Sequence, residues 1–216
     1  MLPRPVCRPR KTSTDRIHKL IRNLQRIQIK ISSKAPRNLS LEPFLEIFAR
    51  WRKEKHAAEW VDLADYAHIP RGPGIVLIGQ RCNFAFDMVD PAPGILYTAK
   101  KGLTGTPLER LHSTLQWCLE LSQRLVGESE FPSSAMPRTD LLEIRFTDRL
   151  ETPNTASTTM ELRPAVQQML DVIYGSGGYE LIPQTDARQC YGFSVRIGAS
   201  QPLDGLLKRA RSTLAR

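Results

Sequence analysis

Apolar residues recur along this chain at two spacings, one typical of helices and the other of strands. Apolar positions three or four residues apart predict helices at residues 40–56, 106–125, 153–173 and 203–214. Apolar positions that alternate with polar ones, or form a short continuous run, predict strands at residues 27–31, 75–78, 94–98, 142–146, 179–182 and 191–197. For the first of these strands, the alternative is one long helix that continues to Ser32.

The predicted elements follow the order βαββα, and the same order then repeats. The first part of the series, βαββαβ, has the element order of a ferredoxin-like unit. Helices that cover a mixed, largely antiparallel sheet are the natural packing for such a series. We therefore expect the α+β fold class, with residues 26–216 as a single domain. The continuous run Ile75–Ile78 is typical of a strand covered on both faces, and we expect it to form an antiparallel hairpin with Gly94–Thr98.

The net charge of +9 belongs to the N-terminal end of the chain. Residues 1–37 carry eleven Lys and Arg residues and one acid, so the remaining residues are close to neutral. We expect residues 1–25 to be a basic, partly disordered arm that contains a short amphipathic helix. Such an arm is attracted to nucleic acid, anionic lipid or an acidic protein surface. No aromatic residue precedes Phe44, so nucleic acid would be bound nonspecifically, through residues 1–30.

The spacing of the cysteines limits which cofactors and which cellular compartment the sequence predicts. Cys7, Cys82, Cys118 and Cys190 are scattered and form no C-x-x-C pair, so no metal or other cofactor is predicted. Scattered cysteines fit a reducing compartment, and we expect a cytoplasmic protein. No apolar run reaches the roughly 18–20 residues that span a bilayer, so no transmembrane segment is predicted. The Arg-rich, acid-poor N-terminus also resembles an organelle transit peptide.

A first candidate site is the set Asp62, Asp65 and His68. On a helical turn the two aspartates would share a face, and a carboxylate can fix the tautomer of a histidine that acts as a general base. Arg81 and Cys82, beyond the apolar run, would add an anion-binding charge and a nucleophile, but at the opposite end of the predicted strand. The competing interpretation is structural, because Asp and His often bond to the backbone in turns and helix caps.

A second candidate site precedes the helix that begins near Thr106. Lys100, Lys101 and Thr106, with the free amides of that helix terminus, would bind a phosphate or carboxylate, and Arg81 is a further anion-binding candidate. No G-x-x-x-x-G-K-[ST] sequence is present, so this is not a nucleotide-binding P-loop. The competing interpretation is a solvated basic loop.

Residues 62–79 read D-L-A-D-Y-A-H-I-P-R-G-P-G-I-V-L-I-G, and they resemble a D-x-A-D-Y-x-H-x-P-x-G-P-G block of an uncharacterised bacterial protein family. Asp148–Leu150 with Pro153–Thr155 resembles a second block of that family, so the resemblance spans roughly residues 26–200. Relatives often continue the first block with Gly-His-Glu, where this chain has Gly79-Gln80-Arg81. That departure weakens a metal or acid/base role at this position. The resemblance implies a coherent fold and no particular activity.

These observations favour a non-catalytic protein that binds a ligand or a partner, such as another protein or a small anion. The alternative is an enzyme that acts on an anionic substrate with Asp65 and His68. A second alternative is nonspecific association with nucleic acid through the basic arm.

Overall fold

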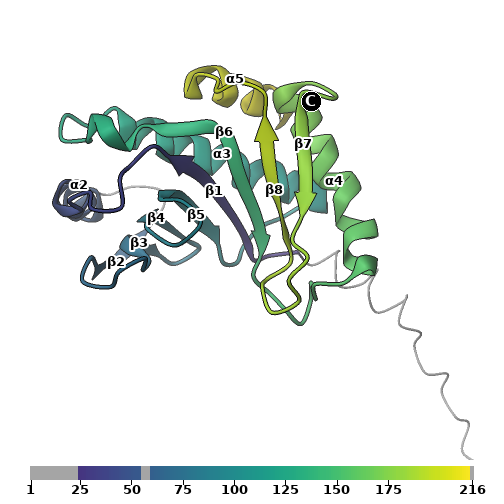
Figure 1. The fold of residues 1–216 in the computed structure, drawn as a ribbon, viewed down its shortest axis with the longest axis horizontal. Helices are drawn as coiled ribbons and strands as arrows, with labels where there is room; N and C mark the ends of the chain where they lie inside the picture. Colours follow the sequence, from purple (N-terminus) through teal and green to yellow (C-terminus); the bar gives the residue numbers. More distant parts are fainter. Residues whose placement is uncertain (1–23, 55–58, 215–216) are drawn as a thin grey trace, which may run out of the picture.

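The computed structural model describes residues 24–54 and 59–214, and its centre is one eight-stranded sheet (Figure 1). The strand order is β2-β3-β4-β5-β1-β6-β8-β7, and all of these neighbours pair antiparallel. The strands are β1 (Ile27–Ser33), β2 (Trp60–Tyr66), β3 (Gly74–Gly79), β4 (Cys82–Asp87), β5 (Gly94–Ala99), β6 (Pro137–Phe146), β7 (Tyr179–Pro183) and β8 (Gly192–Ile197).

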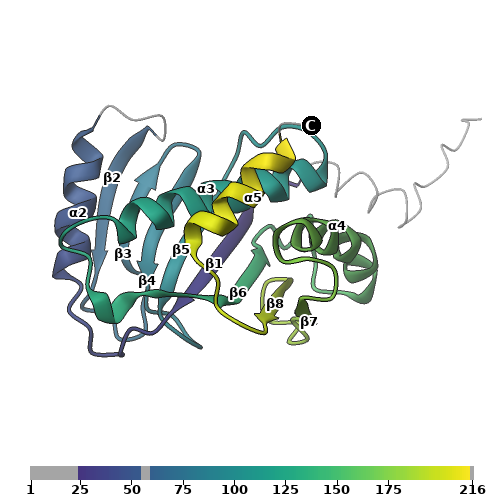
Figure 2. The ribbon, with the colours of Figure 1, turned by 90° about the horizontal axis from the view of Figure 1, so that it is seen from above.

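Helices cover one face of this sheet (Figure 2). They are α2 (Glu42–Lys53), α3 (Pro107–Val126), α4 (Ala156–Tyr174) and α5 (Leu203–Leu214). Ile29 of β1 lies opposite Tyr97 of β5 and Ile144 of β6, so these three buried side chains share a face. On that face α3 packs against β1 and β5, α2 against β2 and β3, and α4 against β7, whereas α5 packs against α3 and α4.

Aromatic contacts fix α2 on the sheet. The ring of Phe44 stacks on Phe86 of β4 with 3.9 Å between centroids, and Trp51 stacks on Phe84 of the same strand. All four side chains are fully buried. Burial of one such side chain stabilises a fold by roughly 1.5–3 kcal/mol, so these rings hold α2 against the β3–β4 side of the sheet.

The α+β fold class is confirmed, and three details of the sequence prediction are corrected. The sheet is antiparallel throughout the described residues rather than mixed. Strands β2 and β4 were not predicted, so the first half reads βαββββα and lacks the ferredoxin-like order, whereas the second half has the predicted order βαββα. β4 lies between β3 and β5, so these two strands form no hairpin with each other.

The strand at Ile75–Ile78 is covered on one face only. Ile75 and Leu77 are buried beneath the helices, whereas Val76 and Ile78 on the other face are half-buried. This follows from the antiparallel connections, which leave one face of the sheet without a helical layer. Of the predicted basic arm, residues 1–23 lie outside the described part of the chain, and only Leu24 and Gln25 lie within it.

Candidate functional site

Asp62, Asp65 and His68 do not lie on a helical turn. Asp62 and Asp65 belong to the edge strand β2, where an odd separation places them on opposite faces. The Asp62 carboxylate accepts a hydrogen bond from the Leu63 N–H at 2.8 Å, and the Asp65 carboxylate accepts one from the Ala67 N–H at 2.8 Å.

His68 lies exposed in the turn between β2 and β3. Within the described residues, no hydrogen bond or ion pair joins it to Asp62 or Asp65. A general base needs its orienting carboxylate within hydrogen-bond distance, and the side chains here do not form that pair. The aspartates instead accept hydrogen bonds from nearby backbone N–H groups, and Asp62 also lies 3.6 Å from the guanidinium of Arg52, so the structural interpretation of this set is favoured.

Arg81 and Lys101, by contrast, line the same cavity. The cavity has a volume of about 150 Å³ and lies between the adjoining ends of β4 and β5 and the outer side of α3. The Lys100 N–H donates to the Arg81 carbonyl oxygen at 2.8 Å, which holds the two loop segments together. Gly102 has a φ of +82°, so the loop turns back beside the Arg81 side chain in a conformation that suits glycine. The other lining residues are Cys82, Tyr97, Ala99, Gly102, Leu103, Trp117 and Leu121.

Part of the pocket lining is apolar. Trp117 and Leu121 of α3 stand one helical turn apart, and Leu103 of the loop completes this part. Trp117 is 38% exposed, which is unusual for a side chain of this size. We refer to the cavity lined by Arg81, Lys101, Leu103, Trp117 and Leu121 as the Arg81–Trp117 pocket.

The positive charge at this pocket is not compensated. Within the described residues, the side chains of Arg81, Lys100 and Lys101 form no hydrogen bond and no ion pair. Most arginines elsewhere in the described chain do have a partner, as Arg50 has in Glu128 and Glu130. Uncompensated cations beside an apolar wall attract an anion that carries an apolar group.

Cys82, in the lining, is poorly suited to act as a nucleophile. Burial raises the pKa of its thiol, and a hydrogen bond from Tyr97 and the positive charge of Lys100 oppose that rise only in part. Burial also raises the pKa of the nearby Tyr97 hydroxyl. Since a thiolate is the reactive form, a thiol with a raised pKa at neutral pH is mostly unreactive.

Thr106 is engaged in capping α3. Its hydroxyl accepts a hydrogen bond from the Glu109 N–H at 3.3 Å, and the Glu109 carboxylate accepts one from the Thr106 N–H at 2.6 Å. The capping bonds lower the pKa of Glu109, so this end of α3 carries its own negative charge. A bound anion would have to compete with that carboxylate. Of the predicted anion-binding residues, Arg81 and Lys101 therefore line one pocket, and the backbone of Lys100 is bonded to Arg81 beside it. Thr106 instead caps α3.

Trp117, Leu121, Leu103 and Tyr97 were not singled out from the sequence. One signal was present: Trp117 lies outside the apolar stripe of its helix, in which Leu111, Leu115, Cys118 and Leu125 are buried. A single exposed apolar residue is common on protein surfaces, so this signal alone did not identify a site. Its pairing with Arg81 depends on the sheet topology, which the sequence did not reveal.

The described residues offer neither a metal site nor a membrane-spanning helix. No group of three or more His, Cys, Asp or Glu side chains in this part of the chain is arranged to hold a metal ion. None of its helices combines the length and the apolar character needed to cross a membrane. Among known proteins, no family model matches the chain, and no curated protein matches it either, so the resemblance at residues 62–79 stays a prediction.

Proposed function

We propose that this protein is a cytoplasmic binding protein whose Arg81–Trp117 pocket takes a small organic anion without chemical change. The observation that carries this proposal is the pair of uncompensated cations, Arg81 and Lys101, which line the same pocket as the apolar side chains of Trp117 and Leu121. The cations would bind a phosphate or carboxylate, and Trp117 and Leu121 would pack against an apolar or aromatic part of the same ligand.

The alternative of an enzyme that uses Asp65 and His68 has less support. Those side chains lack the contact that general-base catalysis needs, and the aspartates are bonded to backbone N–H groups. The thiol in the pocket has a raised pKa, which disfavours a covalent step there. Binding without turnover needs none of these groups to be activated.

Phenyl phosphate is a suitable probe because it combines a dianion with an aromatic ring. Titration calorimetry should show binding, and the fluorescence of Trp117 should change, since Trp117 lines this pocket and Trp51 and Trp60 do not. The double variant Arg81→Gln/Lys101→Gln should weaken binding at least about tenfold, because charged hydrogen bonds contribute about 1.5–3 kcal/mol each.

The double variant Lys34→Gln/Arg163→Gln is the matched control. It removes the same charge from two cations that lack a hydrogen-bond or ion-pair partner among the described residues and do not line the pocket. We expect it to bind phenyl phosphate almost as the unmodified protein does. Equal weakening in both double variants would show that net charge, rather than the pocket, attracts the ligand, and would contradict the proposal.

A further inference from the structure

The lining of the Arg81–Trp117 pocket divides into a buried inner part and an exposed mouth. Four lining residues are at most 6% exposed, and these are Cys82, Tyr97, Ala99 and Leu121. By contrast, Arg81, Lys101 and Trp117 are exposed. Moving a charge into the buried part would cost far more than leaving it in contact with water. A ligand that carries an anion therefore enters with its uncharged end first and keeps its charge at the mouth.

The cavity has the size of a single ring. Its volume is about 150 Å³. An apolar cavity of about 150 Å³ holds one benzene molecule, whereas sites for drug-sized ligands measure roughly 300–1,000 Å³. An aromatic ring that enters beside Trp117 also gains the contact that two aromatic rings make with each other. The volume and this neighbour together favour one aromatic ring over a larger fused system.

The polar atoms of the inner part are bonded to each other. Among its four side chains only those of Cys82 and Tyr97 carry a polar atom, and a hydrogen bond joins the thiol to the hydroxyl. A hydroxyl group of a sugar placed there would lose its hydrogen bonds to water and would have to compete for this pair. The inner part therefore suits a ring without polar substituents.

The two cations at the mouth suit a dianion. Across residues 24–54 and 59–214, the side chains of Arg81 and Lys101 form no hydrogen bond and no ion pair, so both can contact the oxygens of a ligand. A guanidinium binds a phosphate through two parallel N–H···O bonds, and an ammonium acts as a point charge. A phosphomonoester carries about 1.5–2 negative charges at neutral pH, whereas a carboxylate or a sulfate ester carries one.

We propose that the ligand of the Arg81–Trp117 pocket is the phosphomonoester of a single aromatic ring. The ring fills the inner part beside Trp117, and the phosphate stays at the mouth on Arg81 and Lys101. Binding makes and breaks no covalent bond. This inference rests on the proposed function, because the same pocket supplies the anion site. It narrows the ligand class by rejecting aryl carboxylates, sugar phosphates and phosphates of fused rings.

The test is titration calorimetry of the full chain at about pH 7.5 with phenyl phosphate and three comparison ligands. Phenyl sulfate has nearly the same shape and one charge less, and it should bind at least about fivefold more weakly. 1-Naphthyl phosphate adds a second ring, and overpacking should weaken its binding by about 5- to 150-fold. Ribose 5-phosphate keeps the charge but replaces the apolar ring, and it should bind at least about tenfold more weakly.

Enlarging the pocket tests where the ring lies. Leu121→Ala removes volume from the inner lining, so it should abolish the preference for phenyl phosphate over 1-naphthyl phosphate. Leu125→Ala is the matched control, because Leu125 is a buried leucine of the same helix that does not line the pocket. It should keep the preference. Leu103→Ala enlarges the pocket from the loop and serves if Leu121→Ala fails to fold, which circular dichroism checks.

The outcomes separate this inference from the proposed function. If phenyl phosphate binding depends on Arg81 and Lys101, but 1-naphthyl phosphate or phenyl sulfate binds as tightly, this inference is overturned and the proposed function stands. An equal loss of preference in Leu121→Ala and Leu125→Ala would overturn the placement of the ring in the pocket. The absence of any phenyl phosphate binding would overturn both the inference and the proposed function.

Discussion

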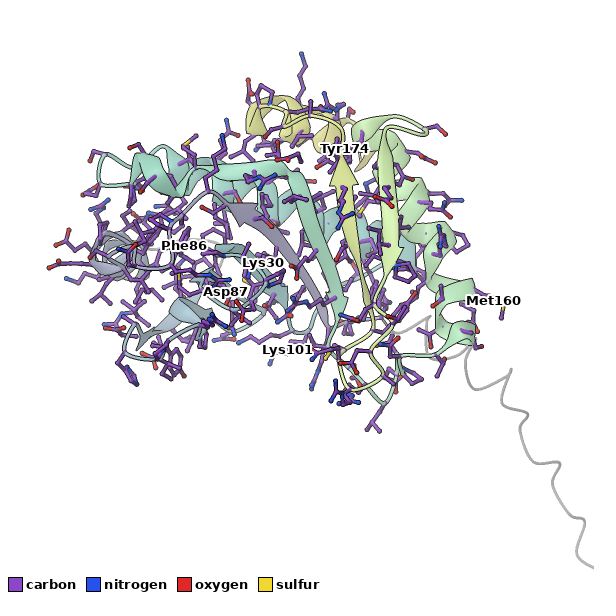
Figure 3. The ribbon with its side chains drawn as sticks, viewed as in Figure 1. Lys30, Phe86, Asp87, Lys101, Met160 and Tyr174 are labelled. Atoms are coloured by element: carbon purple, nitrogen blue, oxygen red, sulfur yellow. The ribbon has the colours of Figure 1, made fainter. Side chains whose placement is uncertain are left out.

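The ammonium of Lys30 lies 2.6 Å from the carboxylate of Asp87, and only 2% and 4% of these side chains are exposed (Figure 3). The same ammonium donates to the Val89 carbonyl oxygen at 2.8 Å. Lys30 belongs to β1 and Asp87 to β4, and β5 separates these strands in the sheet. The ion pair therefore joins two strands that have no backbone hydrogen bonds with each other, on the face opposite the helices.

Breaking this pair should destabilise the fold strongly. Asp87→Ala leaves a buried ammonium without its anionic partner, and we expect the free energy of unfolding to fall by about 3–5 kcal/mol. Urea denaturation measures this change. The double variant Lys30→Met/Asp87→Leu removes both charges and should recover most of the loss. Glu180→Ala, which breaks the exposed Arg196–Glu180 pair, is the control and should cost less than about 1 kcal/mol. A similarly small effect for Asp87→Ala would contradict the prediction.

The second half of the fold was predictable from the sequence because its elements bury one face cleanly. In β8, the side chains of Phe193, Val195 and Ile197 are buried and alternate with exposed Ser194 and Arg196. The strand β4 carried a similar signal, since Cys82, Phe84 and Phe86 alternate along it, but the turn residues on both sides made it resemble part of a loop.

The edge strand β2 gave a misleading signal. This strand lies at the edge of the sheet and has polar residues on both faces. Its two aspartates are also three residues apart, as on a helical turn. That spacing produced the incorrect helical interpretation of the first candidate site. For the second site, the charges of Arg81 and Lys101 were evident in the sequence. The apolar part of the pocket comes from Trp117, which is distant from them in the chain. Such long-range contacts depend on the order of the strands, which the sequence did not reveal.

His112 should make stability depend on pH. Its ring is buried, only 3% of the residue is exposed, and its Nδ1 atom has no hydrogen-bond partner among the described residues. Burial lowers the pKa of this imidazole in the folded state. The unfolded chain, with a His pKa of about 6.5, therefore takes up the proton first as the pH falls.

The free energy of unfolding should accordingly be highest above about pH 7 and decrease as the pH falls through about 6.5 towards the lower folded-state pKa. Urea denaturation at several pH values measures this, and His112→Leu should remove this part of the decrease. His68→Gln is the control, because His68 is exposed and its substitution should leave the pH profile unchanged. Identical pH profiles of stability for His112→Leu and the unmodified protein would show that His112 does not cause the pH dependence.

The cysteines should differ widely in reactivity. Burial raises the pKa of the Cys118 thiol to about 12 and also raises that of Cys82, whereas Cys190 is only partly buried. In a Cys7→Ser background, which removes the thiol outside the described residues, an aromatic disulfide reagent at neutral pH should modify one thiol quickly and two slowly. Peptide mapping should identify the fast site as Cys190. Rapid modification of Cys82 would instead indicate that the Arg81–Trp117 pocket opens to the reagent.

We expect Asp62 and Asp65 to protect the β2 edge of the sheet, which is a role that needs no substrate. β2 pairs with β3 on one side only, and exposed charges on such an edge oppose pairing with another chain. The double variant Asp62→Thr/Asp65→Thr removes both charges and adds residues that favour strands, so we expect a higher mean molecular mass by sedimentation velocity. The control Glu46→Thr/Asp204→Thr removes the same charge from exposed helical positions and should sediment as the unmodified protein does. An unchanged mass for the Asp62 and Asp65 variant would show that these carboxylates do not protect the edge.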